Sequence, residues 1–262
     1  MKVLIKPNAT DIQSYEAEAI TEDIYRVNNK YYKKSSLIFL EDGENEIVPK
    51  IIPEIIPDMV FIKGGYIEFE KNIPSQKGEI SDFYIGKYPV TQKQWTDVMG
   101  TNPSYFKGCD NCPVESVSWN NVQDFIKKLN AKTGKNYRLP TSLEWIYAAI
   151  GGKNYEFERY DNYVPKTEYL DGATEPVGQK KPNGYGLHDM TSNVWEWCED
   201  DWHSNYNGAP TNGKAWIDSP RAASRVLRGG SWNYNNYLCR STNRSNVAPT
   251  YRYNGYGLRL AQ

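Results

Sequence analysis

The sequence has few of the features that mark membrane, nucleic-acid-binding or metal-centred proteins. No apolar run approaches the ~20 residues that a membrane-spanning helix needs, and the start "MKVLIKPNAT" has an apolar patch too short for a secretory signal. The formal net charge of −1 offers no attraction to nucleic acid or to an anionic membrane. Two histidines exclude a three-histidine metal centre. We therefore expect a globular protein with no transmembrane segment and no nucleic-acid partner.

Cysteine is also scarce. The four cysteines are too few for a disulfide-dense scaffold, and they do not form two zinc-ligand pairs. The sequence "GCDNC" at Cys109 and Cys112 has CxxC spacing, which suits a redox motif, half of a metal site or a small closed loop. Because no second CxxC and no thioredoxin-like pattern accompany it, we favour the structural interpretation.

Aromatic residues, by contrast, are abundant. They make up 14% of the 262 residues, so we expect large flat side chains in the core and on the surface. Residues 1–52 alternate short polar and apolar runs and predict a small β-rich appendage. The proline-rich run "VPKIIPEIIP" predicts an extended connector, so we place a second domain over residues 53–262.

Three helix starts in the second domain carry their own caps. Thr91 with Gln94 and Thr141 with Glu144 fit the capping box, in which two side chains satisfy exposed backbone N–H groups. Ser118 precedes the second of these helices, which has one apolar face. That face consists of Val122, Phe125, Ile126 and Leu129.

Glycines mark the predicted turns and helix ends. Two alternating apolar runs in "MVFIKGGYIEFE" predict a β-hairpin that turns at Gly64–Gly65. Gly134 and Gly151–Gly152 predict the ends of the second and third helices. From residue 153 onward, short apolar or aromatic segments alternate with Gly, Pro and Asn turns. We therefore predict an α+β fold with few helices, short strands and much ordered loop.

Six motifs occur in order over roughly residues 56–260. They are "YPVTQKQW", "CPVESVSWNNVQDF", "YRLPTSLEW", "NGYGLHDMTSNVWEWCEDDW", "RVLRGGSW" and "GYGLRL". Together they resemble the formylglycine-generating-enzyme (sulfatase-modifying factor) domain, a variant of the C-type lectin fold. The resemblance implies a C-type-lectin-like fold of this subclass for residues 53–262 and leaves residues 1–52 outside it.

Only part of this family's copper site is present. In the enzymes, two copper-binding cysteines fall three and eight positions after the serine of "RGGS", which correspond here to Tyr234 and Cys239 when counted from Ser231. A Cu(I) site needs two thiolates, and a phenol cannot replace one of them. By this resemblance, copper binding is not expected. A thiol oxidase or related enzyme with an atypical site is the alternative function.

The C-terminal segment resembles another branch of the family, the variable proteins of diversity-generating retroelements, in which adenines of a template repeat are mutagenised. The resemblance lies in the frame "RVLRGGSWN…CRS…R…PT…R…GxRL". Template codons AAC or AAT changed at adenine give Asn, Tyr, Ser, Leu, Val, Ala or Gly, but never Lys, Glu, Gln, Met or Trp. Residues 233–256 contain none of the excluded types, and nearly half are Asn or Tyr. The alternative is a loop that is rich in Asn and Tyr by chance or for structural reasons.

We therefore predict a non-catalytic ligand-binding protein with a variable region at residues 232–260. Tyr offers a large amphipathic contact with few torsions to order, and Asn and Ser adapt their hydrogen bonds, as in an antibody paratope. The predicted ligand-binding residues are Tyr234, Asn235, Tyr237, Leu238, Asn243, Ser245, Asn246, Val247, Ala248, Tyr251, Tyr253, Asn254, Gly255 and Tyr256. The predicted fixed frame is Trp232, Arg240, Ser241, Arg244, Pro249, Arg252, Gly257 and Arg259. For any one ligand-binding residue, packing on its own domain is the alternative.

The resemblance also implies a calcium site, although binding requires no cofactor. Its ligands would be the side chains of Asp189 and Glu196 and the backbone oxygens of Ser192 and Val194. The alternative is an Asx-type turn at Asp189, with Glu196 hydrogen-bonded in the core.

Three further expectations concern Cys239, the partner and the location. We interpret Cys239 as a buried small hydrophobic residue or a disulfide partner of Cys198. The predicted partner is a protein or glycan of unknown identity. The resemblance implies a lipoprotein-like display at the cell surface or outside the cell, whereas the sequence alone assigns no compartment. We expect a monomer, because no coiled-coil pattern or second apolar face is present.

Overall fold

The computed structural model divides the chain into two compact units, Met1–Ile51 and Ile52–Gln262. In the second unit it describes residues 57–67, 77–151, 172–233, 239 and 241–262, and in the first it describes the backbone of short strands. These strands are β1 (Lys2–Ile5), β2 (Ser14–Glu16), β3 (Glu18–Ala19), β4 (Ile24–Val27), β5 (Lys30–Lys33) and β6 (Leu37–Phe39). They form two antiparallel sheets with the strand orders β2-β1-β6 and β3-β4-β5.

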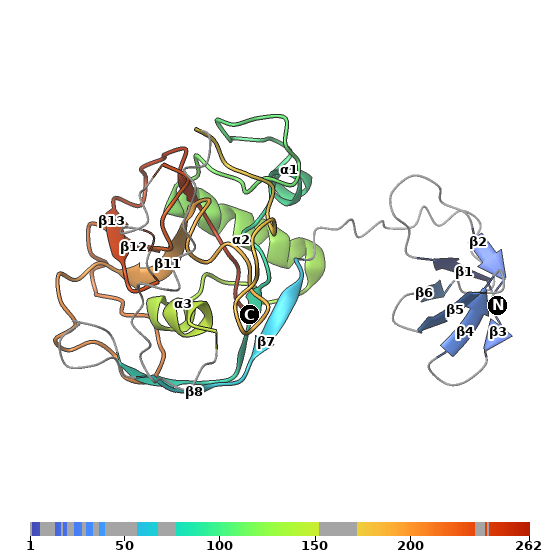
Figure 1. Cartoon of the computed structure of the whole chain (residues 1–262), viewed down its shortest axis with the longest axis horizontal. Coiled ribbons are helices and arrows are strands. Elements are labelled where there is room, and N and C mark those ends of the chain that lie inside the picture. Colours follow the sequence, from blue (N-terminus) through green and yellow to red (C-terminus); the bar gives the residue numbers. More distant parts are fainter. Residues whose placement is uncertain are drawn as a thin grey trace. The chain divides into compact units, whose positions relative to one another are not determined.

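The second unit combines helices with short strands and long connecting segments (Figure 1). Its helices are α1 (Gln92–Met99), α2 (Trp119–Thr133) and α3 (Ser142–Ala149). Its strands are β7 (Met59–Ile62), β8 (Gly65–Ile67), β9 (Gly78–Ile80), β10 (Phe83–Gly86), β11 (Trp195–Asp201), β12 (Arg225–Arg228), β13 (Arg244–Val247) and β14 (Tyr256–Gly257). This architecture confirms the predicted α+β class. No helix in the described part of the chain is long and apolar enough to cross a membrane.

The helices begin where their caps predict. The side chains of Thr91, Ser118 and Thr141 each accept a hydrogen bond from the backbone N–H three residues later, completing three capping boxes. α2 ends at Gly134, whose φ of 68° is left-handed and suits glycine. α3 ends at Ala149, just before the predicted stop at Gly151. The predicted apolar face of α2 is buried in the core.

The predicted hairpin at Gly64–Gly65 is wrong. β7 pairs with β10 and β8 pairs with β9, so β7 and β8 run on as one side of a longer antiparallel ribbon. Gly64 lies between β7 and β8, where its N–H donates to Asp82 Oδ1 at 2.9 Å. A Cβ on Gly64 would lie 2.2 Å from the carbonyl oxygen of Ile80, so glycine permits this close approach of the two strands. The alternating pattern identified the strands but not their partners.

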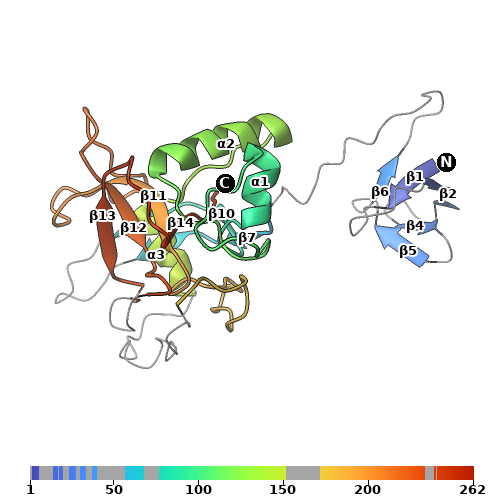
Figure 2. The same cartoon turned by 90° about the horizontal axis from the view of Figure 1, so that it is seen from above.

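A four-stranded sheet of order β13-β12-β11-β14 forms the centre of the unit. β11 is buried on both faces, as expected for a central strand. Trp195 and Trp197 pack with α1 and α2, whereas Cys198 packs with α3. α2 and α3 accordingly lie on opposite sides of the sheet (Figure 2). The end of the chain, marked C in Figure 1, returns to β10, where Gln262 N–H donates to Tyr84 O at 2.9 Å.

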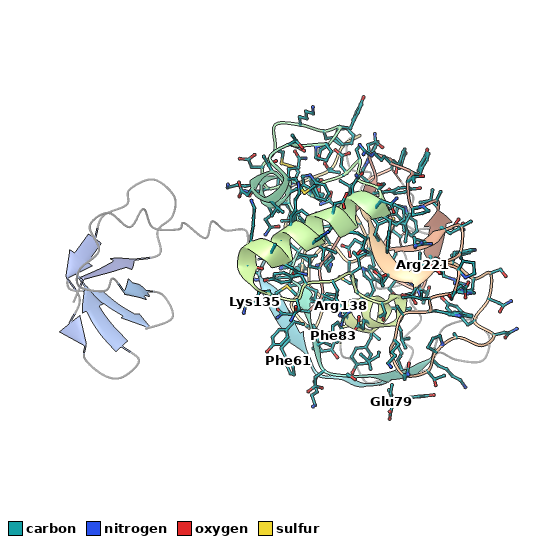
Figure 3. All side chains as sticks on the ribbon, turned by 180° about the vertical axis from the view of Figure 1, so that it is seen from behind. Phe61, Glu79, Phe83, Lys135, Arg138 and Arg221 are labelled. Carbon is teal, nitrogen blue, oxygen red and sulfur yellow. A yellow bond between two sulfur atoms is a disulfide. The ribbon has the colours of Figure 1, made fainter. Side chains whose placement is uncertain are left out.

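Arginine side chains bind the end of β11. Arg221 donates from Nη1 to Glu199 Oε1 at 2.9 Å and from Nε to Asp201 Oδ1 at 3.0 Å. Its guanidinium lies 4.8 Å from the ring centroid of Trp119 on α2. Figure 3 shows Arg221 beside this strand. The charged end of β11 is therefore tied to α2 as well as to the sheet.

Asp200 on β11 connects the sheet to α3. Its buried carboxylate accepts from the N–H of Ser142 at 2.7 Å, at the start of α3, and from the N–H of Trp216 at 2.9 Å. Burial raises the pKa of Asp200 from 3.8 to about 6, and the two N–H donors and Arg228 partly oppose that rise. The charged form is therefore less stable in the folded protein than in the unfolded chain.

We expect Asp200→Asn to change how stability depends on pH. Because the folded pKa lies above the unfolded pKa, Asp200 favours folding below about pH 4, and this contribution is lost as the pH rises through about 6. At about 1.4 kcal/mol per pKa unit, the loss amounts to roughly 3 kcal/mol. Denaturant unfolding should therefore show that the free energy of unfolding of Asp200→Asn increases relative to that of the wild type between pH 4 and pH 7. A difference that stays constant with pH would contradict this.

The matched control is Asp82→Asn. Hydrogen bonds from Lys63 and from the N–H of Gly64 lower the pKa of the exposed Asp82. Asp82 therefore contributes stability that is lost as the pH falls, so its substitution should change the pH dependence in the opposite direction.

Candidate functional site

Trp232 begins the predicted variable region and ties both of its ends together. Its backbone N–H donates to Asn193 O at 2.9 Å. Its indole Nε1 donates to Asn254 O at 3.0 Å, near the far end of the region. Its ring meets the ring of Phe106 edge-on, with centroids 5.2 Å apart. These contacts give Trp232 the predicted frame role.

Arg228 fixes the segment that leads into β13. The residue is 1% exposed, and its guanidinium donates to Ser142 Oγ at 2.8 and 3.0 Å. It also donates to the carbonyl oxygens of Thr242 at 3.0 Å and Asn243 at 3.3 Å. β13 is thereby anchored to the start of α3.

β13 is an edge strand of the central sheet, as far as the described residues show. It pairs antiparallel with β12 and places Ser245 opposite Leu227. The guanidinium of Arg244 lies over the rings of Trp202 and Tyr206, at 4.3 and 4.1 Å from their centroids. The frame role predicted for Arg244 thus takes the form of stacking on two aromatic rings.

The remaining part of the variable region is also held by its backbone. Carbonyl oxygens of Pro249 and Tyr253 each accept at 3.1 Å from backbone N–H groups, those of Asn120 and Ser116 respectively. Gly255 O accepts from the N–H of Trp195 at 2.7 Å. Because these bonds use backbone atoms, the frame holds the segment whatever its side chains are.

The tyrosines of this part lie together. The rings of Tyr253 and Tyr256 have centroids 5.2 Å apart, and Tyr251 and Tyr256 have centroids 6.2 Å apart. Asn233 donates from its side-chain amide to the Tyr253 hydroxyl. The structure therefore brings three of the predicted binding tyrosines into one aromatic cluster.

The predicted binding residues differ in exposure. Tyr234, Asn235, Tyr237 and Leu238 lie outside the described residues, as does the frame residue Arg240. Exposed members are Asn246, Ala248 and Tyr251. Half-buried members are Asn243, Ser245, Val247, Tyr253, Asn254 and Tyr256.

Two assignments need correction. Gly255, predicted as a surface position, is buried, and a Cβ there would lie 2.9 Å from Ser231 Oγ, so its role is close backbone packing. Arg252, predicted as part of the frame, is exposed. Both errors arise because composition alone does not reveal which way a loop residue faces.

The loop before α2 also contacts the variable region, although no sequence pattern predicted it as part of the site. Phe106 contacts Trp232, and the backbone around Ser116 contacts Tyr253, although these residues lie far apart in the chain. The only sequence signal is the aromatic pair in "SYFKGC". A pair of aromatic residues does not by itself reveal a long-range neighbour.

The cysteines have structural roles. Cys109 and Cys112 form a disulfide, so the CxxC motif closes a small loop, as the structural interpretation expects. Cys198 and Cys239 are buried, and no disulfide joins them, so the first interpretation of Cys239 holds and the second is wrong. Burial raises the pKa of both thiols. A Cβ on Gly230 would lie 2.6 Å from Cys239 Sγ, which shows how closely this thiol is packed.

Glu196 is bound to an arginine rather than poised for a cation. Its carboxylate is buried and accepts from Arg259 Nε and Nη2 at 2.9–3.1 Å, and from Trp145 Nε1 at 2.6 Å. Asp189 Oδ2 accepts from the N–H of Gly178 at 2.8 Å. The guanidinium already neutralises Glu196, which weakens the attraction of this carboxylate for a calcium ion. The calcium site stays a prediction, and these contacts favour the alternative in which Glu196 is hydrogen-bonded in the core.

Residues 48–262 match the family of sulfatase-modifying factor enzyme 1-like domains. The chain is 35% identical to the chaperone protein LppX of Paenibacillus barcinonensis, over 67% of this chain and 78% of that protein. It is 31% identical to the formylglycine-generating enzyme of Bos taurus, over 93% of this chain. The match spans 66% of the length of the bovine enzyme.

Two solved structures share the fold. PvdO from Pseudomonas aeruginosa superposes with a TM-score of 0.68 at 27% identity, covering 80% of this chain and 95% of that one. Treponema denticola variable protein 1 superposes with a TM-score of 0.65 at 28% identity, covering 78% and 94%. These similarities confirm the C-type-lectin-like fold of the formylglycine-generating-enzyme subclass. They also confirm the resemblance to variable proteins.

We expect Arg259→Met to lower the free energy of unfolding by about 3–5 kcal/mol, because it leaves the buried Glu196 carboxylate without its counter-charge. Denaturant unfolding measures this loss. Arg252→Met is the matched control, since its exposed side chain should change stability by less than about 0.5 kcal/mol. Adding Glu196→Gln to Arg259→Met should recover part of the loss. Equal effects of the two arginine substitutions would contradict the proposed importance of the pair.

Proposed function

We propose a non-catalytic, ligand-binding function for this chain, which belongs to the family of sulfatase-modifying factor enzyme 1-like domains. In this proposal the family fold supplies a rigid frame. The variable region, residues 232–260, supplies interchangeable side chains that contact the ligand and are diversified by a retroelement.

One observation carries the proposal: the frame holds the variable region mainly through backbone carbonyls. The carbonyl oxygens of Asn243, Tyr253, Asn254 and Gly255 each accept a bond from a residue outside those positions. Such bonds survive when a side chain is replaced. Residues 233–256 also contain none of the five residue types that adenine mutagenesis of Asn codons cannot produce. A backbone-held segment with this composition suits repeated diversification.

The similarity to Treponema denticola variable protein 1 supports this function, because it extends over 78% of the chain. The exposed positions also have suitable chemistry. Tyr251 can anchor a ligand with its ring, and Asn246 can adapt its hydrogen bonds. The combination resembles a paratope in which the backbone is constant and the side chains differ.

A thiol oxidase is the second candidate, favoured by the similarity to the formylglycine-generating enzyme of Bos taurus and by the presence of Cys239. Two observations weigh against it. Tyr234 stands at the position of the family's other copper-binding cysteine. Cys239 is 1% exposed, and burial raises the pKa of its thiol, which disfavours the thiolate that binds Cu(I).

We further propose that the ligand is a protein or glycan met at the cell surface or outside the cell. The Cys109–Cys112 disulfide supports this location, because disulfides persist mainly in oxidising compartments. The net charge of −1 gives no reason to propose a nucleic-acid ligand.

The DNA beside the gene tests the retroelement. We expect a second, non-coding copy of the segment for residues 232–260 that differs from the gene almost only at adenines, together with a gene for a reverse transcriptase. The expectation follows from the residue types missing between 233 and 256. Sequencing the flanking DNA is the measurement. Absence of both the repeat and the reverse transcriptase would remove the basis for diversification.

A copper titration separates binding protein from oxidase. With ascorbate as reductant, which leaves the Cys109–Cys112 disulfide intact, we expect no competition with a Cu(I) chelator such as bathocuproine disulfonate, because one buried thiol cannot form a two-thiolate site. Cys239→Ser and Cys198→Ser should behave like the wild type. If the wild type takes up Cu(I) stoichiometrically and only Cys239→Ser abolishes this uptake, the result would support the thiol oxidase function instead.

A further inference from the structure

Tyr105 is the most exposed of the large aromatic and aliphatic side chains noted on the described surface. It is 70% exposed, whereas Tyr251 in the variable region is 51% exposed. Tyr105 lies in the loop between α1 and α2, outside the variable region. An exposed tyrosine on its own carries no function. The structure of this loop and its contacts with the variable region are what indicate a function for Tyr105.

Buried polar side chains hold the backbone on either side of Tyr105. Glu115 is fully buried, and its Oε1 accepts from the N–H of Phe106 at 2.8 Å. Its other oxygen accepts from Ser116 Oγ at 2.8 Å, and its own N–H donates to Ser104 Oγ at 3.2 Å. The buried carboxylate of Glu115 thus helps to fix the backbone conformation of residues 104–106.

Gln92 on α1 adds a second set of bonds. It is 1% exposed, and its Nε2 donates to Phe106 O at 2.8 Å. Its Oε1 accepts from Asn102 Nδ2 at 2.8 Å, and Asn102 Oδ1 in turn accepts from the N–H of Ser104 at 3.0 Å. The Cys109–Cys112 disulfide closes the other end of the loop. Tyr105 is therefore displayed on a preorganised backbone, which lowers the entropy lost on binding.

The same loop contacts the variable region directly. The Phe106 ring contacts the rings of both Tyr105 and Trp232 in T-shaped arrangements, with centroids 5.0 and 5.2 Å apart. The N–H of Ser116, next to Glu115, donates to Tyr253 O. Trp232 in turn donates to Asn254 O, next to Tyr253 in the chain. Tyr105 is thus connected through Phe106 and Trp232 to the segment that carries the tyrosine cluster.

We propose that Tyr105 is a fixed anchor of the ligand-binding surface and that the ligand is a protein. This inference rests on the proposed binding function and adds a contact residue that diversification does not change. A fixed tyrosine beside changing ones supplies the same apolar contact to every ligand, while the variable side chains select among ligands.

Composition favours a protein over a glycan. Protein interfaces are enriched in Tyr, Trp and Arg and depleted in Lys, Asp and Glu. Residues 232–256 contain Trp232, five Tyr and three Arg, and no Lys, Asp or Glu. The surface therefore suits a protein partner.

A phage library of disulfide-constrained 12-residue peptides provides the probe. The library is selected on the wild-type chain with excess Tyr251→Ala as competitor, so that the recovered peptides bind at the variable region. We expect such peptides to bind Tyr105→Ala at least about tenfold more weakly than the wild type, as for an interface hot spot. Tyr84→Ala is the matched control, since Tyr84 is 46% exposed on β10 and should leave the affinity unchanged.

The outcomes distinguish the proposed anchor role of Tyr105 from the proposed ligand-binding function on which it rests. Peptides that bind Tyr105→Ala as tightly as the wild type would overturn the anchor and leave the variable surface standing. A second outcome is that no recovered peptide discriminates against Tyr251→Ala, while binding to a glycan array depends on Tyr251. This outcome would overturn the protein partner alone. Failure of both probes would contradict the binding function itself. Unchanged melting temperatures of all three alanine variants show that the effects do not come from unfolding.

Discussion

The buried contact between Glu196 and Arg259 joins parts of the domain that lie far apart in the chain. Besides Glu196 on β11, Arg259 donates to the carbonyl oxygens of Gly86 at 2.8 Å and His188 at 2.7 Å. Glu196 in turn accepts from Trp145 on α3. Because each partner would be a buried, unpaired charge without the other, the contact constrains all of these segments together. Both residues are buried, and their hydrogen bonds use none of the exposed side chains of the variable region.

The frame and the variable side chains are separated by the kind of atom that each contact uses. Arg228, Trp232 and Ser116 all donate to backbone carbonyl oxygens of the variable region. Every residue type carries that acceptor, so replacing a side chain leaves the bond in place. Exposed side chains such as Tyr251 project from a backbone that is fixed by these frame residues. The proposed diversification of side chains would therefore leave these bonds in place.

Local signals were sufficient for the helices and insufficient for the sheets. The caps at Thr91, Ser118 and Thr141 predict the helix starts correctly, because each capping box is complete within four residues. The hairpin at Gly64–Gly65 was wrong because strand pairing is decided by distant partners, here β9 and β10. Glycine at that position reflects a close approach of strands rather than a turn.

The sequence by itself determined the family, the three helix starts and the unusual composition of residues 233–256, since motifs, caps and residue types are local properties. Only the tertiary structure decided that Gly255 is buried, that Arg252 is exposed and that Tyr105 stands beside the variable region. It also assigned Glu196 to Arg259. The physical reason is the same in each case: exposure and the partner of a buried charge depend on which distant segments pack together, and no local pattern records that.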